Sequence, residues 1–137
     1  MASSNTYVIY CVDAPCDTFV ADPNGGPRRV GAKRMSCMDE HNAYQMATSS
    51  PNHECCMHKI AAVPMLAQDG VTIIGSSFLV QAPREDCERF VHSDPFFLNQ
   101  VWESVSINKF SGAGKPQAPA SQKKTTAGPI QYRSQRV

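Results

Sequence analysis

Short hydrophobic runs separated by turn-forming residues divide the first part of the chain into strands. Alternating or continuous runs rich in β-branched and aromatic residues are typical of strands. Four segments have this pattern: 6–12, 54–63, 71–80 and 101–110. The pair Asp69-Gly70 lies between the second and third segments and is a common hairpin-turn signal.

Two helices are predicted between these strands. Over residues 31–48 the longest apolar side chains recur close to the helical period, which predicts an amphipathic helix. Its predicted stripe is Met35, Met38, Asn42 and Met46. A second helix is predicted to begin after Pro83, with acidic residues in its first turn, and to end at Asp94-Pro95. Residues 96–100 are predicted to form a short connection or helical turn.

The resulting order is β-α-β-β-α-β, which predicts an α+β, ferredoxin-like fold over residues 6–110. Such a fold has a four-stranded antiparallel sheet with two helices on one face. The other face then needs cover, and in a domain of this size a second identical subunit is the usual cover. We therefore expect a homodimer through the open sheet face.

Two segments differ in composition from the rest of the chain. Residues 13–30 are rich in Pro, Gly and Asp and are predicted to form a loop. Residues 111–137 form an irregular, low-complexity C-terminal extension with five basic residues and no acid. Both segments are candidate attachment points for a larger protein complex.

Charge and composition exclude several classes of function. The 137 residues carry a net charge of +1, which argues against a nucleic-acid-binding protein. No apolar run approaches the roughly 20 residues that cross a bilayer. The N-terminus lacks a secretory signal, so the six cysteines are expected to be free thiols in an intracellular reducing compartment. The cytoplasm is favoured, and an organelle interior after presequence removal is the alternative.

The motifs of the first 110 residues, taken in order, resemble those of the YCII-related (YciI-like) family of the dimeric α/β-barrel superfamily. The resemblance covers residues 6–110 and is carried by Tyr7-Val8-Ile9-Tyr10, Ala61-Ala62-Val63-Pro64, Asp69-Gly70, Gly75-Ser76, Asp94-Pro95-Phe96 and Val101 to Phe110. It implies dimerisation sheet to sheet and a pocket beside the sheet with a His–Asp pair. Some members are lyases or isomerase-like enzymes of ring compounds, including dehydrochlorinases.

By position, the resemblance makes His41 and Asp94 the candidate catalytic pair. A carboxylate bonded to one imidazole nitrogen fixes the tautomer and makes the other nitrogen a better base. Ser76 and Tyr10 are the candidate substrate-binding residues. The alternative is a surface histidine and an aspartate that serves only as a turn residue before proline.

Two other candidate sites are weaker. If residues 53–58 form a strand, His53, Cys55 and Met57 face one side, but this spacing is not that of a closed zinc site. A Cys37 nucleophile one helical turn before His41 would have no motif behind it. We therefore predict neither a metal site nor a cofactor.

Two hypotheses about function follow. The first is a small dimeric acid–base enzyme of lyase or isomerase type acting on a small ring compound. The second is a non-catalytic accessory or structural subunit of a larger assembly, anchored by residues 13–30 and 111–137. The retained His41 and Asp94 favour the first. The two extra segments and two departures from the family pattern, Val63 in place of glycine and Phe96 in place of tyrosine, favour the second about equally.

Overall fold

The computed structural model describes residues 5–23 and 26–110, and the predicted extension over residues 111–137 lies outside this range. Its main sheet has four strands in the spatial order β4-β5-β1-β6, and every neighbouring pair is antiparallel. The strands are β1 (Asn5–Asp13), β4 (His58–Leu66), β5 (Ile73–Ala82) and β6 (Trp102–Lys109).

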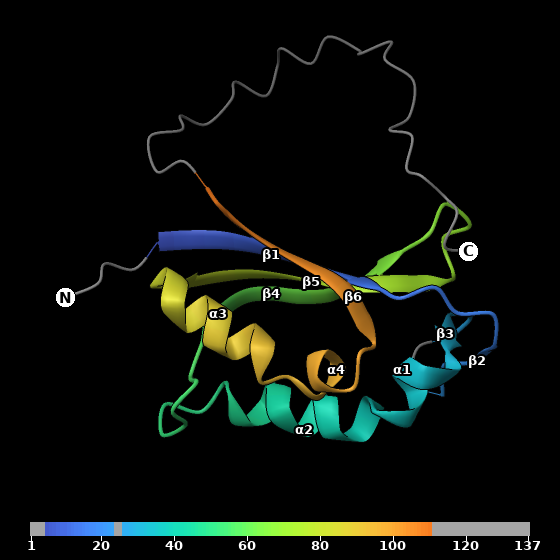
Figure 1. The fold of residues 1–137 in the computed structure, drawn as a ribbon, viewed down its shortest axis with the longest axis horizontal. Coiled ribbons are helices and arrows are strands. Elements are labelled where there is room, and N and C mark those ends of the chain that lie inside the picture. The colour runs from blue at the N-terminus through green and yellow to red at the C-terminus, as the bar shows by residue number, and fades with distance from the viewer. Residues whose placement is uncertain (1–4, 24–25, 111–137) are drawn as a thin grey trace, which may run out of the picture.

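The helices pack on one face of this sheet, as Figure 1 shows. They are α1 (Ala32–Ser36), α2 (Met38–Ala47), α3 (Arg84–His92) and α4 (Pro95–Leu98). Together with the strand order, this arrangement confirms the predicted α+β, ferredoxin-like fold. Within the described residues, no helix has both the length and the hydrophobicity needed to span a membrane.

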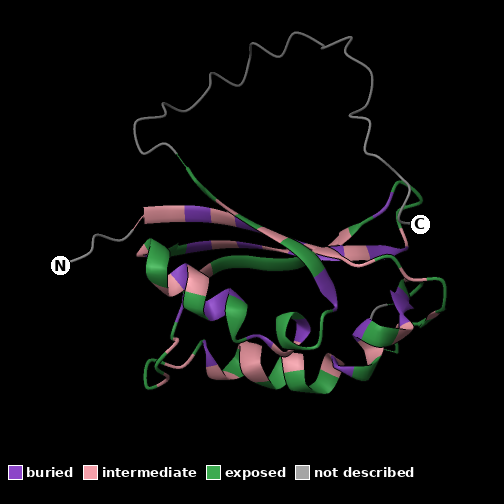
Figure 2. Cartoon of the chain, in the orientation of Figure 1, coloured by how far each residue is buried: buried purple, intermediate pink, exposed green. Residues whose placement is uncertain are grey.

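The core lies between the sheet and the helices because alternate residues of each strand point to the same side. On β1, Tyr7, Ile9 and Cys11 are buried, whereas Tyr10 between them is 45% exposed. Phe90 of α3 is fully buried and packs edge-on against Phe78 of β5. Figure 2 shows the same alternation of buried and less buried positions along the strands.

The segment predicted as one helix over 31–48 is two helices that meet at Cys37. The Cys37 amide donates to the carbonyl of Arg34, three residues back, which closes α1 with a tight turn. The predicted methionine stripe is right only in part, since Met38 packs against the core, whereas Met46 is 78% exposed. The side of these helices that faces the sheet also carries polar groups, among them the buried Arg34, which a search for an apolar stripe does not include.

Two further boundaries differ from the prediction. The predicted loop over 13–30 contains a two-stranded sheet of β2 (Phe19–Ala21) and β3 (Arg29–Gly31), tied to the main sheet by a bridge from Arg29 to Thr72. The second main-sheet strand begins at His58, because residues 53–57 form turns, including a bond from the Cys56 amide to the His53 carbonyl. The predicted alternation of metal ligands along 53–58 is therefore wrong.

Gly75 is the closest point between β5 and β1. A Cβ at this position would collide with the backbone carbonyl of Cys11 and with the end of the Met65 side chain. Its own carbonyl accepts a hydrogen bond from Arg34, 3.2 Å away. Gly75 therefore links the spacing of the sheet to the position of a buried arginine.

We predict that Gly75→Ala destabilises the protein by roughly 1–3 kcal/mol, because the backbone of β1 has to move to relieve the collision. The free energy of unfolding from urea titration measures this effect. Ser77→Ala, two residues along the same strand and only partly buried, is the matched control. A Gly75→Ala variant as stable as the control would contradict the prediction.

Candidate functional site

A cavity of about 340 Å³ opens between the first two helices and the β4–β5 side of the sheet. Its volume is at the small end of the ~300–1,000 Å³ range of ligand pockets. Polar and charged side chains share its lining with apolar ones. The lining residues are Asp22, Pro23, Arg28, Arg34, Met35, Met38, His41, Asn42, Gln45, Ala62, Val63, Pro64, Ile73, Ser76, Phe78 and Phe96.

Asp94 organises one wall of this region from a fully buried position. It is the N-cap of α4, where its Oδ1 accepts a hydrogen bond from the amide of Phe96 at 2.8 Å. Pro95 at the first helical position suits this cap because it has no amide that needs a partner. The first turn of α4 therefore holds the carboxylate in a fixed orientation.

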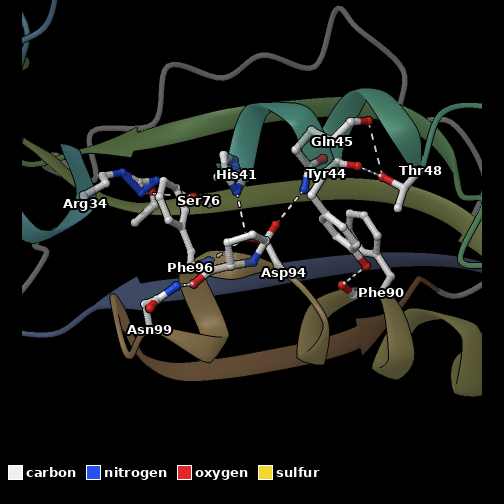
Figure 3. A network of polar contacts seen from close by, with 12 residues as sticks. Arg34, His41, Tyr44, Gln45, Thr48, Ser76, Phe90, Asp94, Phe96 and Asn99 are labelled. Carbon is white, nitrogen blue, oxygen red and sulfur yellow. Dashed lines mark hydrogen bonds and ion pairs between the residues drawn. The ribbon is translucent and has the colours of Figure 1, made fainter. Parts of the chain in front are cut away.

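Two side chains of α2 then converge on this carboxylate. His41 Nδ1 lies 2.8 Å from Asp94 Oδ1, and Gln45 Nε2 donates to Asp94 Oδ2 at 2.8 Å. The two residues are one helical turn apart, so they lie on the same side of the helix. Figure 3 shows both reaching the carboxylate from α2.

The imidazole of His41 is held by packing as well as by this hydrogen bond. It stacks on the ring of Phe96, with 3.8 Å between centroids and 7° between planes, and it meets the edge of Trp102. The side chain is 12% exposed, and within the described residues no hydrogen bond engages Nε2. With Nδ1–H donated to the carboxylate, Nε2 carries the lone pair of the neutral ring.

The C-terminal half of α2 is anchored to the core, which fixes the position of Gln45. Lys59 of β4 donates to the Gln45 backbone carbonyl at 2.7 Å and to Thr48 Oγ1 at 2.8 Å. The Tyr44 hydroxyl donates to the carbonyl of Phe90, and burial raises the pKa of that phenol. Because the Gln45 amide nitrogen faces Asp94, its Oε1 is left buried with no partner in the described chain.

Arg34 of α1 supplies a second polar group in the cavity, and only 4% of this residue is exposed. Its Nη2 donates to the Ser76 hydroxyl and to the Gly75 carbonyl of β5, and its Nη1 lies 3.4 Å from Asp13 Oδ1. Burial lowers the pKa of this guanidinium, and the nearby carboxylate of Asp13 opposes that shift. The guanidinium carbon also lies 4.6 Å from the centroid of the Phe96 ring.

The structure brings together three of the four predicted site residues. His41 and Asp94 are hydrogen-bonded, and Ser76 lines the same cavity as His41. Tyr10 lies on the opposite face of the sheet, since its neighbours Ile9 and Cys11 point into the core. It is not among the residues that line the cavity.

Arg34 and Gln45 belong to the site and were not predicted. Gln45 lies one helical turn after His41 on α2, so the two share one side of that helix. Arg34 belongs to α1, before the break at Cys37, and no helical spacing connects it to His41. A search for apolar residues misses all three. Arginine is rarely buried unless it is paired, so the burial of Arg34 marks it as a residue with a specific role.

The cysteine and metal candidates have ordinary surroundings. Cys37 is buried, with its sulfur 3.7 Å from the hydroxyl of Ser36. The imidazole Nδ1 of His53 accepts a hydrogen bond from the amide of Cys55. Among residues 5–23 and 26–110, no three His, Cys, Asp or Glu side chains cluster in a way that would hold a metal ion.

Among solved structures, the chain is similar to a dehydrochlorinase. The fold is similar to that of 5-chloro-2-hydroxyhydroquinone dehydrochlorinase (TftG) from Burkholderia phenoliruptrix AC1100, solved in complex with 2,5-dihydroxybenzoquinone. The TM-score is 0.55 at 18% identity, and the match covers 77% of this chain and 93% of that chain. At this level of identity the likeness shows that the two chains share a fold.

No protein-family model matches the chain, and no curated protein matches it.

Asp94→Ala is predicted to destabilise the protein by about 2 kcal/mol or more. The change removes a helix cap worth about 1 kcal/mol and leaves buried donors without an acceptor. Asp94→Asn keeps an oxygen for the Phe96 amide and should be affected less. The free energy of unfolding from urea titration distinguishes them, with exposed Asp39→Ala as the control. Equal stability of Asp94→Ala and the control would show that these hydrogen bonds contribute little.

Proposed function

We propose that the protein is a small acid–base enzyme of lyase or isomerase type that acts on a ring compound. His41 is its general base, and Asp94 orients His41. The observation that carries the proposal is the 2.8 Å hydrogen bond between His41 Nδ1 and a fully buried carboxylate, at the wall of a ligand-sized cavity. A surface histidine beside a turn aspartate would have neither the cavity nor the stacked ring.

The division of roles follows from the hydrogen bonds. Asp94 accepts the Nδ1 proton of His41 and stabilises the imidazolium that forms when Nε2 takes a proton. The stacked ring of Phe96 restricts rotation of the imidazole. Gln45 occupies the second carboxylate oxygen, so the carboxylate has a single orientation toward His41.

An elimination is the reaction that this arrangement suits best. Nε2 of His41 removes a proton from the substrate, the freed electron pair forms a new double bond, and the leaving group departs with the electrons of its own bond. The proton and the leaving group together account for every atom lost, so the step needs no oxidant. An isomerisation uses the same base, with the proton returned to a different atom of the ring.

The family resemblance and the structural match support this assignment. The YCII-like resemblance over residues 6–110 assigns, by position, the two residues that form the hydrogen-bonded pair. The structurally similar protein is named as a dehydrochlorinase of a hydroxylated ring. We propose membership of the YCII-like family and a hydroxylated or halogenated six-membered ring as the substrate class.

We further propose a homodimer through the sheet face opposite the helices. That face carries the exposed Tyr10 of β1, and the fold type is one in which two sheets pack against each other. The six free cysteines suit a reducing compartment. An accessory-subunit role through residues 13–30 and 111–137 remains the alternative if the catalytic test fails.

The catalytic proposal predicts that the purified protein releases chloride from 5-chloro-2-hydroxyhydroquinone or a related halogenated quinol. His41→Ala should lower kcat by about 10²–10⁴, the range that a general base contributes. Chloride release under anaerobic conditions is the measurement, because oxygen oxidises such substrates. Asn42→Ala, at a cavity-lining position without a proposed role, is the control and should keep most of the activity.

Two results would contradict the catalytic proposal. One is no turnover of any halogenated or hydroxylated ring by the folded protein. The other is a His41→Ala variant as active as the control. Either result would make the accessory-subunit role the working hypothesis.

The dimer proposal predicts that wild-type protein sediments with the mass of two chains. Tyr10→Asp should shift the equilibrium toward monomer, because it buries a charge on the sheet face that the second subunit would cover. Met46→Asp, at an exposed position on the helical side, should leave the mass unchanged. Sedimentation equilibrium measures both. A wild-type monomer, or a Tyr10→Asp dimer as tight as wild type, would contradict the interface.

A further inference from the structure

We propose that Arg34 and Ser76 form an anion subsite that binds an ionised ring oxygen of the substrate, an enolate or a phenolate, while His41 handles the proton. This inference rests on the proposed function, and it names the substrate class as rings whose oxygen is negatively charged when bound. The observations that carry it are the burial, the contacts and the location of the Arg34 guanidinium.

The first observation is that the buried guanidinium of Arg34 has no bidentate carboxylate partner within the described residues. Within the described residues, the carboxylate that contacts Arg34 is Asp13, through one 3.4 Å contact to Nη1 and not a bidentate pair. The other printed contacts of the guanidinium are to neutral oxygens, the Ser76 hydroxyl and the Gly75 carbonyl. Buried arginines are usually matched by two parallel hydrogen bonds to a carboxylate or a phosphate. An anionic ligand oxygen would give the guanidinium a second charged acceptor besides Asp13.

The second observation is a donor without a partner. Arginine has five N–H groups in a rigid fork, and the contacts described above use only its two terminal nitrogens. Within residues 5–23 and 26–110, no hydrogen bond engages Nε, although the residue is 4% exposed and lines the cavity. Nε is not among the buried side-chain atoms that lack a partner, so part of it is accessible, and a ligand oxygen in the cavity can accept its hydrogen bond.

The third observation is the position of the guanidinium relative to His41. Both groups contact the ring of Phe96, the imidazole by stacking at 3.8 Å and the guanidinium carbon at 4.6 Å from the centroid. Both line the same cavity, and Figure 3 shows Arg34, Ser76, Phe96 and His41 close together. A single six-membered ring in the cavity can therefore present one atom to His41 and an oxygen to Arg34.

This juxtaposition suits the chemistry of proton removal from a hydroxylated ring. When the base takes a proton, negative charge develops on a ring oxygen. A cation held in place before the reaction stabilises that charge without reorganising, and its effect is larger in a cavity of low dielectric than in water. Arg34 is held by β5 through Gly75 and Ser76, so its position does not depend on the ligand.

The main alternative is that Arg34 only connects α1 to β5. Two probes of similar shape, one negatively charged and one neutral, separate the two roles. We would use 4-nitrophenol in mildly alkaline buffer, where it is a phenolate, and 4-nitroanisole, its neutral methyl ether. Equilibrium dialysis against the full-length protein measures both dissociation constants.

The subsite predicts that wild-type protein binds the phenolate at least about tenfold more tightly than the ether. Ser76→Ala and Arg34→Lys should weaken phenolate binding several-fold or more and change ether binding by less than about twofold. Asp13→Asn should strengthen phenolate binding, because it removes the competing carboxylate. A gain of affinity is a result that damage to the fold does not produce. It also keeps the test decisive if Arg34→Lys fails to fold.

Three outcomes would overturn the subsite. They are equal affinity of wild type for the two probes, phenolate binding unchanged in Ser76→Ala and Asp13→Asn, or no binding of either probe. His41→Ala separates this inference from the proposed function, because it should abolish turnover while phenolate binding stays within about threefold of wild type. Loss of turnover with unaltered binding in the subsite variants refutes the subsite alone. Charge-dependent binding without turnover of any ring refutes the catalytic proposal alone.

Discussion

The buried carboxylate of Asp94 is the group on which the helical layer and the site both depend. It caps α4, bonds His41 and Gln45 of α2, and lies in the layer that covers the sheet. A charge buried this far from water is tolerated only when its acceptor sites are filled by donors. Two elements, α2 and α4, supply the three donors, so hydrogen bonds as well as apolar packing set the position of α2 against α4.

Arg34 imposes a second polar constraint on the same layer. Its side chain extends from α1 to β5, where Ser76 and Gly75 accept its hydrogen bonds. The helical segment breaks at Cys37, between the arginine and α2. The side of the two helices that faces the sheet thus carries polar groups. The cavity lies between this side and the sheet, where polar and apolar side chains line it together.

These constraints explain which features the sequence predicted and which it did not. The four strands and the helix after Pro83 follow from hydrophobic periodicity and turn residues, because their packing is apolar. The methionine stripe over 31–48 was right only in part, since Met38 packs against the core and Met46 is exposed. The polar side chains of Arg34, His41 and Gln45 share the inward side, and an apolar periodicity does not report them. His41 and Asp94 were found through family resemblance, whereas the partners of Ser76 depend on a contact between residues 42 positions apart, which periodicity does not reveal.

The double role of Asp94 has a consequence for how sequences with this fold are interpreted. A substitution at His41 removes the proposed base and one donor to the carboxylate but leaves the α4 cap intact. A substitution at Asp94 disturbs the cap and both α2 contacts, so folding depends on it whether or not there is chemistry to perform. In a sequence with this fold, an aspartate before this proline therefore reports the architecture. The histidine on the facing helix is the position that would report the proposed chemistry.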